Sequence, residues 1–231
     1  MTTRKDSTQL WASIDAKIRS AEALVSHLPT DAFTAELYGM SSKYGRHLMN
    51  NLLSDNEYSY LEIGTFAGSM LISALYGNLP RKHWGIDDWS DKYWPDGVSA
   101  GKSEPEFFKN VQQYLNIVPN FFEVDCFAIN PLDPPYNIKD VDVYFYDGAH
   151  REIDGYNAIM HYFDSLSDQF ILLVDDWNVI HQRMGTERAI NELILAKKLE
   201  VHYERTLPSL SNGGDPWWNG LYIAVGEKQT N

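Results

Sequence analysis

The chain has 231 residues, and 44% of them are hydrophobic, which supplies a sizeable core and excludes a disordered or low-complexity protein. Its 32 acidic residues against 19 lysines and arginines give a formal net charge of −13. This charge excludes nucleic acid and membrane surfaces as expected partners, and it favours neutral or cationic small molecules, or metal ions.

Cysteine content and apolar runs limit the class of protein further. The single cysteine, Cys126, excludes an intrachain disulfide and a cysteine-based zinc site. The basic start of the chain has no apolar stretch behind it, and the longest apolar run, Phe170–Val174, is too short to span a bilayer. We therefore expect a cytoplasmic protein.

Short apolar runs alternate with helical patterns along the chain. Helices are expected at about 7–27, 41–53, 68–76, 103–115, 151–163 and 186–198. Strands are expected at 58–63, 83–87, 121–124, 141–146, 169–174, 201–206 and 221–225. This alternation predicts an α/β fold with a Rossmann-like, mostly parallel sheet of about seven strands and helices on both faces.

The two ends of the chain differ from this repeating pattern. The last two expected strands have no crossover helix between them, so they should pair as an antiparallel hairpin with a long loop over 208–219, which reverses the last strand. Residues 1–56 are expected to form an N-terminal helical cap or lid, or a contact in a homo-oligomer. Residues 57–231 would then form the main domain.

Five consecutive expected strands each end in an acidic residue. These residues are Glu62, Asp87, Asp125, Asp147 and Asp175. Ligands of open parallel sheets bind beyond the carboxyl ends of the strands. The sequence therefore predicts an acidic ligand site at this edge of the sheet.

The first of these acids begins a glycine-containing turn. Glu62 precedes Gly64 and Gly68, which lack the third glycine of a dinucleotide fingerprint. An acid in this position suits a ligand with an amino group and no phosphates, although a tight strand-to-helix turn explains the glycines equally well. Asp87, about twenty residues on, suits a ribose diol, although it and Asp88 are also typical helix caps. Together the features favour an adenosine-type ligand.

Four motifs in chain order extend this pattern: Glu62-x-Gly64-x-x-x-Gly68, Gly85-Ile86-Asp87, Asp147-Gly148-x-His150 and Asp175-Asp176. Their order resembles that of class I S-adenosylmethionine-dependent methyltransferases. It is most similar to the metal-dependent O-methyltransferases that include the macrocin and mycinamicin sugar O-methyltransferases. The likeness covers about 58–195, including a helix-like segment at 185–193. The chain departs from the sugar enzymes at Phe66–Ala67, where they carry a Trp-Arg pair.

The resemblance implies a site for S-adenosyl-L-methionine. Glu62 would accept from the methionyl ammonium, Asp87 would hold the ribose hydroxyls, and Asp125 would lie beside the adenine. The whole expected cofactor-binding set is Glu62, Gly64, Thr65, Phe66, Gly68, Ser69, Asp87, Asp88, Asp125, Cys126 and Asp147.

The resemblance also implies a metal site and a base. Asp147, Asp175 and Asp176 would bind Mg²⁺ through oxygen, and His150, with Asp147 as the second catalytic residue, would take the proton of a small-molecule hydroxyl. Two alternatives stay open. The aspartates could be helix caps or turn formers in a metal-independent methyltransferase, or the chain could be a cofactor-binding protein without turnover.

Other side chains are candidates for the acceptor pocket. The aromatic candidates are Trp89, Tyr93, Trp94, Trp177, Trp217 and Trp218, each of which could equally be an ordinary core or rim residue. Among the histidines outside the motifs, His181 alone lies in an expected substrate loop. Cys126 reads as a small buried side chain rather than a nucleophile.

Overall fold

The computed structural model describes residues 6–29, 36–55, 57–90, 103–207 and 217–229. Its helices are α1 (Ser7–Glu22), α3 (Lys43–Leu52), α4 (Ser69–Leu75), α5 (Ser103–Tyr114), α6 (Glu152–Tyr162) and α7 (Ile180–Leu195), with a short 3₁₀ helix at Phe163–Ser165. Its strands are β1 (Ser59–Ile63), β2 (Lys82–Asp87), β3 (Phe121–Glu123), β4 (Val141–Tyr146), β5 (Leu166–Val174), β6 (Leu199–Leu207) and β7 (Leu221–Lys228). None of the described helices combines the length and the apolar character that crossing a bilayer requires.

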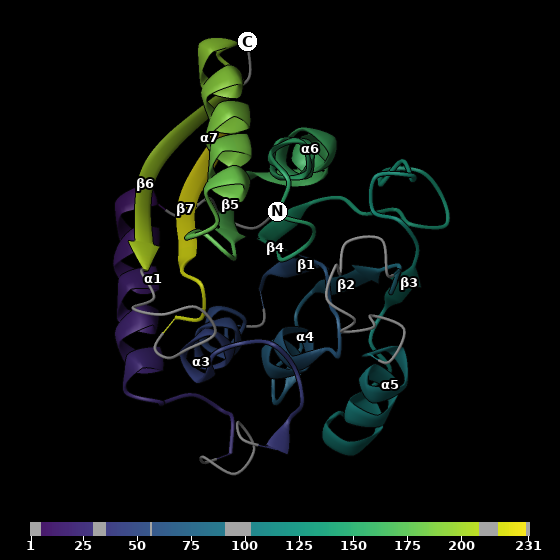
Figure 1. Cartoon of the computed structure of the whole chain (residues 1–231). Helices are drawn as coiled ribbons and strands as arrows, with labels where there is room; N and C mark the ends of the chain where they lie inside the picture. The colour runs from purple at the N-terminus through teal and green to yellow at the C-terminus, as the bar shows by residue number, and fades with distance from the viewer. Residues whose placement is uncertain (1–5, 30–35, 56, 91–102, 208–216, 230–231) are drawn as a thin grey trace.

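The seven strands form one sheet in the order β3-β2-β1-β4-β5-β7-β6 (Figure 1). The first five strands run parallel, whereas β7 lies antiparallel to both β5 and β6. The predicted Rossmann-like sheet with a reversed last strand is therefore confirmed. The chain moves outward from β1 to β3 and then returns to β4 on the other side of β1. This reversal creates the position where ligands bind in open α/β sheets.

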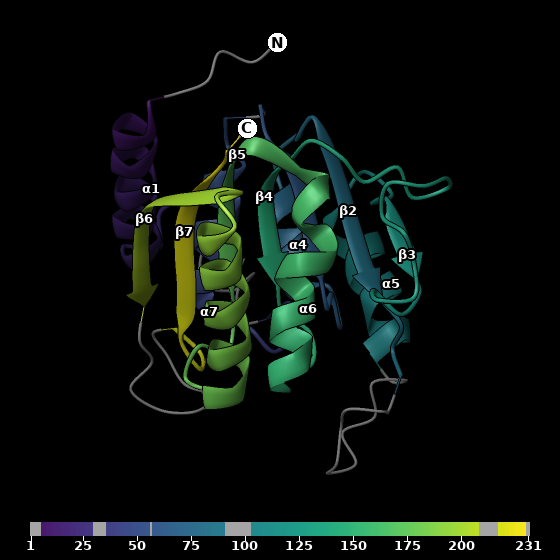
Figure 2. The same ribbon diagram turned by 90° about the horizontal axis from the view of Figure 1, so that it is seen from above.

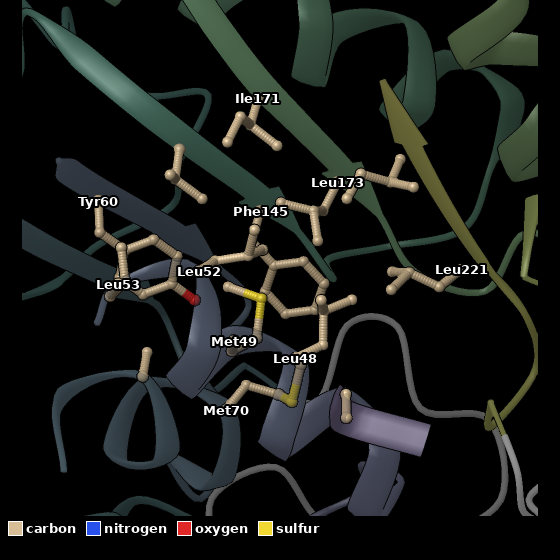
Figure 3. Close-up of a cluster of buried hydrophobic side chains, with 14 of the residues drawn as sticks. Leu48, Met49, Leu52, Leu53, Tyr60, Met70, Phe145, Ile171, Leu173 and Leu221 are labelled. Carbon is tan, nitrogen blue, oxygen red and sulfur yellow. The ribbon is translucent and has the colours of Figure 1, made fainter. Parts of the chain in front are cut away.

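Helices cover both faces of the sheet, as the apolar strands predicted. Helices α6 and α7 lie side by side over one face (Figure 2), while α1, α3 and α4 cover the other. On the face covered by α1, α3 and α4, Leu48 and Leu52 of α3 lie against Tyr60 of β1 and Phe145 of β4 (Figure 3). The N-terminal helices therefore share a core with the sheet, while the domain boundary at 56/57 stays a prediction.

The predicted start of the helix at 186–198 is wrong by six residues. Helix α7 begins at Ile180 and runs through Gly185. A Cβ atom at Gly185 would lie 2.0 Å from the carbonyl oxygen of Glu152, so this glycine permits the close approach of α6 and α7. His181 consequently lies on the exposed first turn of a helix rather than in a loop.

The packing of α3 against the sheet leads to a prediction about stability. Leu48 is fully buried, so we expect Leu48→Ala to lower the free energy of unfolding by about 2–5 kcal/mol, because it removes apolar contacts and leaves a cavity. Denaturant unfolding followed by circular dichroism measures this loss. Leu195→Ala is the matched control, since Leu195 is 84% exposed and should change stability by less than about 0.5 kcal/mol. Equal effects of the two substitutions would contradict the α3 packing.

Candidate functional site

A cavity of about 450 Å³ lies at the carboxyl ends of β1, β2, β4 and β5. The predicted site residues that line it are Glu62, Gly64, Thr65, Phe66, Ser69, Asp87, Asp88, Asp125, Cys126, Asp147, His150, Asp175 and Asp176. Residues that the sequence did not single out also line it, among them Met40, Met70, Tyr146 and Asn219. The structure thus brings nearly the whole expected set to one cavity, and Gly68 is the member that does not line it.

Glu62 is a buried carboxyl group at the wall of this cavity. It lies in β1 and is 1% exposed, and it accepts hydrogen bonds from the Tyr60 hydroxyl and from the backbone N–H of Leu71 in α4. Burial raises its pKa to about 8 even though these hydrogen bonds favour the anion. A cationic group in the cavity would convert this carboxyl group into its ionised form, so Glu62 is suited to an ammonium ligand.

The two glycines of the first loop have structural reasons. Gly64 has a φ of +85°, and a Cβ atom there would lie 2.0 Å from the carbonyl oxygen of Asp147. Gly68 has a φ of +80°, and its Cβ atom would lie 2.7 Å from the Phe107 ring. Gly64 therefore lets the end of β1 lie against the end of β4, while Gly68 lets α4 begin beside α5.

Asp87 fixes two loops around the end of β2. Its Oδ2 accepts from the backbone N–H of Phe66 and its Oδ1 from that of Trp89, each at 2.7 Å. Phe66 and Trp89 both have a positive φ, +47° and +43°, which is uncommon outside glycine and costs conformational energy. Burial raises the pKa of Asp87. Each carboxylate oxygen keeps a second lone pair, with which it can accept from a ligand hydroxyl.

The next turn, after β3, holds Asp125 and Cys126. Asp125 Oδ1 accepts from the backbone N–H of Phe127 at 3.0 Å, which closes the turn. Burial, together with the charges of Asp125, Asp88 and Asp87, raises the pKa of the Cys126 thiol. A raised pKa disfavours the thiolate, which is the form that a cysteine nucleophile requires.

A cluster of donor atoms lies where β4 and β5 end. Asp147, His150 and Asp176 each offer one ligand atom within 4.8 Å of the others. Burial raises the pKa of Asp147 well above its ordinary value, and the charges of Asp175 and Asp176 raise it further. Asp175 also lines the cavity, but its carboxylate is not a member of this cluster. Carboxylates this close together and largely shielded from water require a cation or protons to offset their repulsion.

His150 and Asp176 are hydrogen-bonded to each other within this cluster. His150 Nε2 lies 2.7 Å from Asp176 Oδ2, and the His150 side chain is 43% exposed. Burial lowers the pKa of His150, but the hydrogen bond and charge of Asp176 outweigh it and the pKa is raised. Asp176 has a φ of +54°, and its Oδ1 accepts from Asn219 Nδ2 at 2.6 Å. Two partners thus hold this carboxylate in place.

Asn219 was missed at the sequence level. It is followed by Gly220 just before β7, a pair that signals a turn but not a contact with a carboxylate. It reaches Asp176 because β7 pairs with β5, so the start of β7 lies beside the end of β5. A contact across 43 positions has no local signal in the sequence.

The aromatic candidates divide into one cavity residue and several core residues. Trp218 lines the cavity, as does Met40 from the segment before α3. Trp89, Trp177 and Trp217 are buried in the core clusters instead. Tyr93 and Trp94, with most of the predicted 208–219 loop, lie outside the described residues.

Comparisons with known proteins bear on the fold. No protein-family model matches the sequence, and no curated protein matches it. The structure is similar to an O-methyltransferase from Bacillus cereus in complex with SAH, at a TM-score of 0.56 and 14% identity over 97% of this chain and 93% of that one. It is also similar to cofactor-bound Rv0187 from MTB, at a TM-score of 0.56 and 15% identity over 97% and 92% of the two chains.

A third similar structure has a different acceptor in its name. It is a ribosomal protein L11 methylase from Lactobacillus delbrueckii subsp. bulgaricus, at a TM-score of 0.52 and 11% identity over 82% of this chain and 79% of that one. Likeness at such identities concerns the fold and leaves the acceptor open. The chain thus has the Rossmann-like fold shared by S-adenosylmethionine-dependent methyltransferases.

Proposed function

We propose that the protein is an S-adenosylmethionine-dependent O-methyltransferase that uses Mg²⁺ to methylate a hydroxyl group of a small molecule. One observation carries the proposal. A single cavity joins Glu62 and Asp87, which suit the amino and ribose groups of the cofactor, to the cluster of Asp147, His150 and Asp176. The fold, shared with an O-methyltransferase in complex with SAH, supports the same cofactor.

The cofactor would span the ends of β1, β2 and β3. Glu62 would accept from its ammonium group, Asp87 would accept from the ribose hydroxyls, and Asp125 would accept from the adenine amino group. The loop of Thr65 and Phe66 would lie against the ribose and the sulfonium end. The Thr65 hydroxyl is buried, and among the described residues it has no hydrogen-bond partner, so it is suited to a ligand atom.

Asp147 and Asp176 of the cluster would hold the divalent cation, and Asp175, which lines the same cavity outside the cluster, would be the third ligand that the resemblance implies. The donor set fits this role, because carboxylate oxygens are the ligands that Mg²⁺ prefers and the buried carboxylates have a charge to be offset. A bound cation would acidify the acceptor hydroxyl and orient it.

His150 would be the base. Because its Nε2 bonds to Asp176, Nδ1 is the ring nitrogen left to take the proton of the acceptor hydroxyl. Bound S-adenosylmethionine would supply the methyl group to the hydroxyl oxygen, and SAH would be the product. The partly exposed ring then passes the proton to water.

The acceptor would be an uncharged or cationic hydroxylated molecule. Seven carboxylates line the cavity, and the described lining includes no lysine or arginine, which disfavours a phosphate backbone. Trp218 offers an aromatic face, which suits a sugar or an aromatic ring. A macrocin-type sugar acceptor is the narrower form of this proposal. The segment 1–56 would act as a cap, since Met40 reaches the cavity.

Calorimetric titration with SAH, run once with Mg²⁺ and once with EDTA, tests the proposal. We expect binding in the micromolar range, about −8 kcal/mol. No binding in either buffer would rule out the methyltransferase. Full turnover in EDTA would favour the metal-independent alternative, and SAH binding without turnover on any hydroxylated acceptor would favour a non-catalytic cofactor-binding protein.

Glu62 gives a prediction about protons. With a pKa of about 8, it is mostly protonated at pH 7, and an ammonium group beside it would favour ionisation. Binding of SAH at pH 7 should therefore release up to about 0.9 proton from Glu62. Calorimetry in buffers of different ionisation enthalpy measures this number. Glu62→Gln should abolish the release and weaken binding; an unchanged release in that variant would assign the proton to another group.

A further inference from the structure

Three buried side chains form a hydrogen-bonded chain that ends at the cavity wall. Arg46 Nε in α3 donates to Ser41 Oγ at 2.9 Å, and Ser41 Oγ lies 2.7 Å from Ser69 Oγ at the start of α4. The three residues are 3%, 8% and 5% exposed, and Ser69 lines the cavity. The chain therefore connects a buried guanidinium group with the proposed cofactor site.

The direction of the hydrogen bond between Ser41 and Ser69 follows from which hydroxyl protons need an acceptor. Among the described residues, the partners of the Ser41 hydroxyl are Arg46, which can only donate, and Ser69. If Ser69 donated to Ser41, the proton of the buried Ser41 hydroxyl would have no acceptor, which is costly. Ser41 therefore donates to Ser69. The Ser69 hydroxyl is left to donate its own proton to a group in the cavity.

A backbone contact holds this chain in place. Arg46 Nη2 donates to the carbonyl oxygen of Gly39 at 3.2 Å, and Gly39 lies directly over Ser69. A Cβ atom at Gly39 would lie 2.2 Å from Ser69 Oγ, so the segment before α3 closes over this hydroxyl. Met40, the next residue, lines the cavity. The N-terminal segment is therefore part of the cavity wall at this point.

The charges around the cavity indicate what Ser69 would bind. The described lining carries carboxylates without a lysine or arginine, so an anionic ligand group needs a donor backed by positive charge. Arg46 supplies that charge behind Ser41 and Ser69. Glu62, which accepts from Leu71 in the same first turn of α4, would take an ammonium group nearby. An ammonium and a carboxylate on one carbon atom match this pair of partners.

We infer that Arg46 and Ser41 are positioning residues that orient the Ser69 hydroxyl to donate to the carboxylate of the cofactor's amino-acid end. The inference rests on the proposed function, because it assigns one further contact within the same cofactor site. The segment that holds Ser41 and Arg46 would then favour ligands that carry the carboxylate over ligands that lack it, in addition to covering the sheet.

The test compares two ligands on three forms of the protein. Dissociation constants of SAH and of decarboxylated SAH, which keeps the ammonium group, are measured by calorimetry for the wild type, Ser69→Ala and Ser41→Ala. We expect Ser69→Ala to weaken SAH binding by about 10- to 100-fold, as for a hydrogen bond to a charged group, and Ser41→Ala by about 3- to 10-fold. Binding of the decarboxylated ligand should stay within about twofold in both variants.

Ser73→Ala is the matched control. Ser73 is a buried serine of the same helix whose hydroxyl bonds to the backbone carbonyl of Ser69, and it does not line the cavity. Its loss should leave the ratio of the two dissociation constants unchanged. Equal weakening of both ligands by Ser69→Ala and Ser41→Ala, or no weakening, would overturn the inference while leaving the proposed function intact. Failure of the wild type to bind SAH would instead remove the proposed function, and the inference with it.

Discussion

Replacing His150 by alanine is expected to lower turnover by about 10²–10⁴-fold and to leave SAH affinity nearly unchanged. The residue lies in the cluster with Asp147 and Asp176 rather than among the loops of β1 and β2, where the cofactor is proposed to bind. Its loss would remove the acceptor of the hydroxyl proton, while the groups proposed to hold the cofactor stay in place.

The rate of SAH formation, with saturating S-adenosylmethionine, Mg²⁺ and the best hydroxylated acceptor from a screen, measures the first effect. Calorimetry with SAH measures the second. His181→Ala is the matched control, because His181 is exposed on α7 and does not line the cavity. A large loss of SAH affinity in His150→Ala would assign His150 to cofactor binding, and unchanged turnover would remove it as the base.

Asp147→Asn is expected to lose at least about 100-fold in turnover and, in EDTA, to unfold at a higher temperature than the wild type. Burial and then the charges of Asp175 and Asp176 raise the pKa of Asp147 above its ordinary value of 3.8. Between these two pKa values the folded state binds more protons than the unfolded state, so stability falls as the pH rises. Asparagine does not ionise and avoids this loss.

Thermal unfolding in EDTA as a function of pH tests the stability effect. The difference between the variant and the wild type should be largest at neutral and alkaline pH, at about 2–4 °C for each kcal/mol relieved, and should vanish as the pH falls toward 3.8. Asp168→Asn, at an exposed position of β5, is the control and should change little at any pH. A variant less stable than the wild type would show that the Asp147 charge is already compensated.

The architecture could be predicted because its signals are local. Apolar runs such as 141–146 mark buried strands, and the missing crossover helix before 221–228 predicts the reversed β7. The start of α7 could not be predicted in this way. Gly185 is unfavourable for a helix by its own propensity, and it is tolerated because α6 approaches so closely at Glu152.

Much of the candidate site was also accessible from the sequence. A parallel sheet brings the carboxyl ends of its strands to one edge, so Glu62, Asp87 and Asp147 were expected at that edge. The neighbouring positions of β2, β1 and β4 in the sheet then bring them to one cavity. No comparable rule predicts the positions of Asn219 and Ser41, since each contacts a site residue that is distant in the chain.

The sequence by itself determined the succession of strands and helices along the chain and the acidic residues at the strand ends, because periodicity and turn chemistry act between residues close in the chain. Only the tertiary structure brings His150 and Asn219 to the two oxygens of the Asp176 carboxylate. It also connects Arg46 to Ser69 through the Ser41 hydroxyl. Those contacts depend on packing between α3, α4, β5 and β7. The direction of the hydrogen bond from Ser41 to Ser69 and the raised pKa values of Glu62 and Asp147 follow from burial, which exists only after the chain has folded.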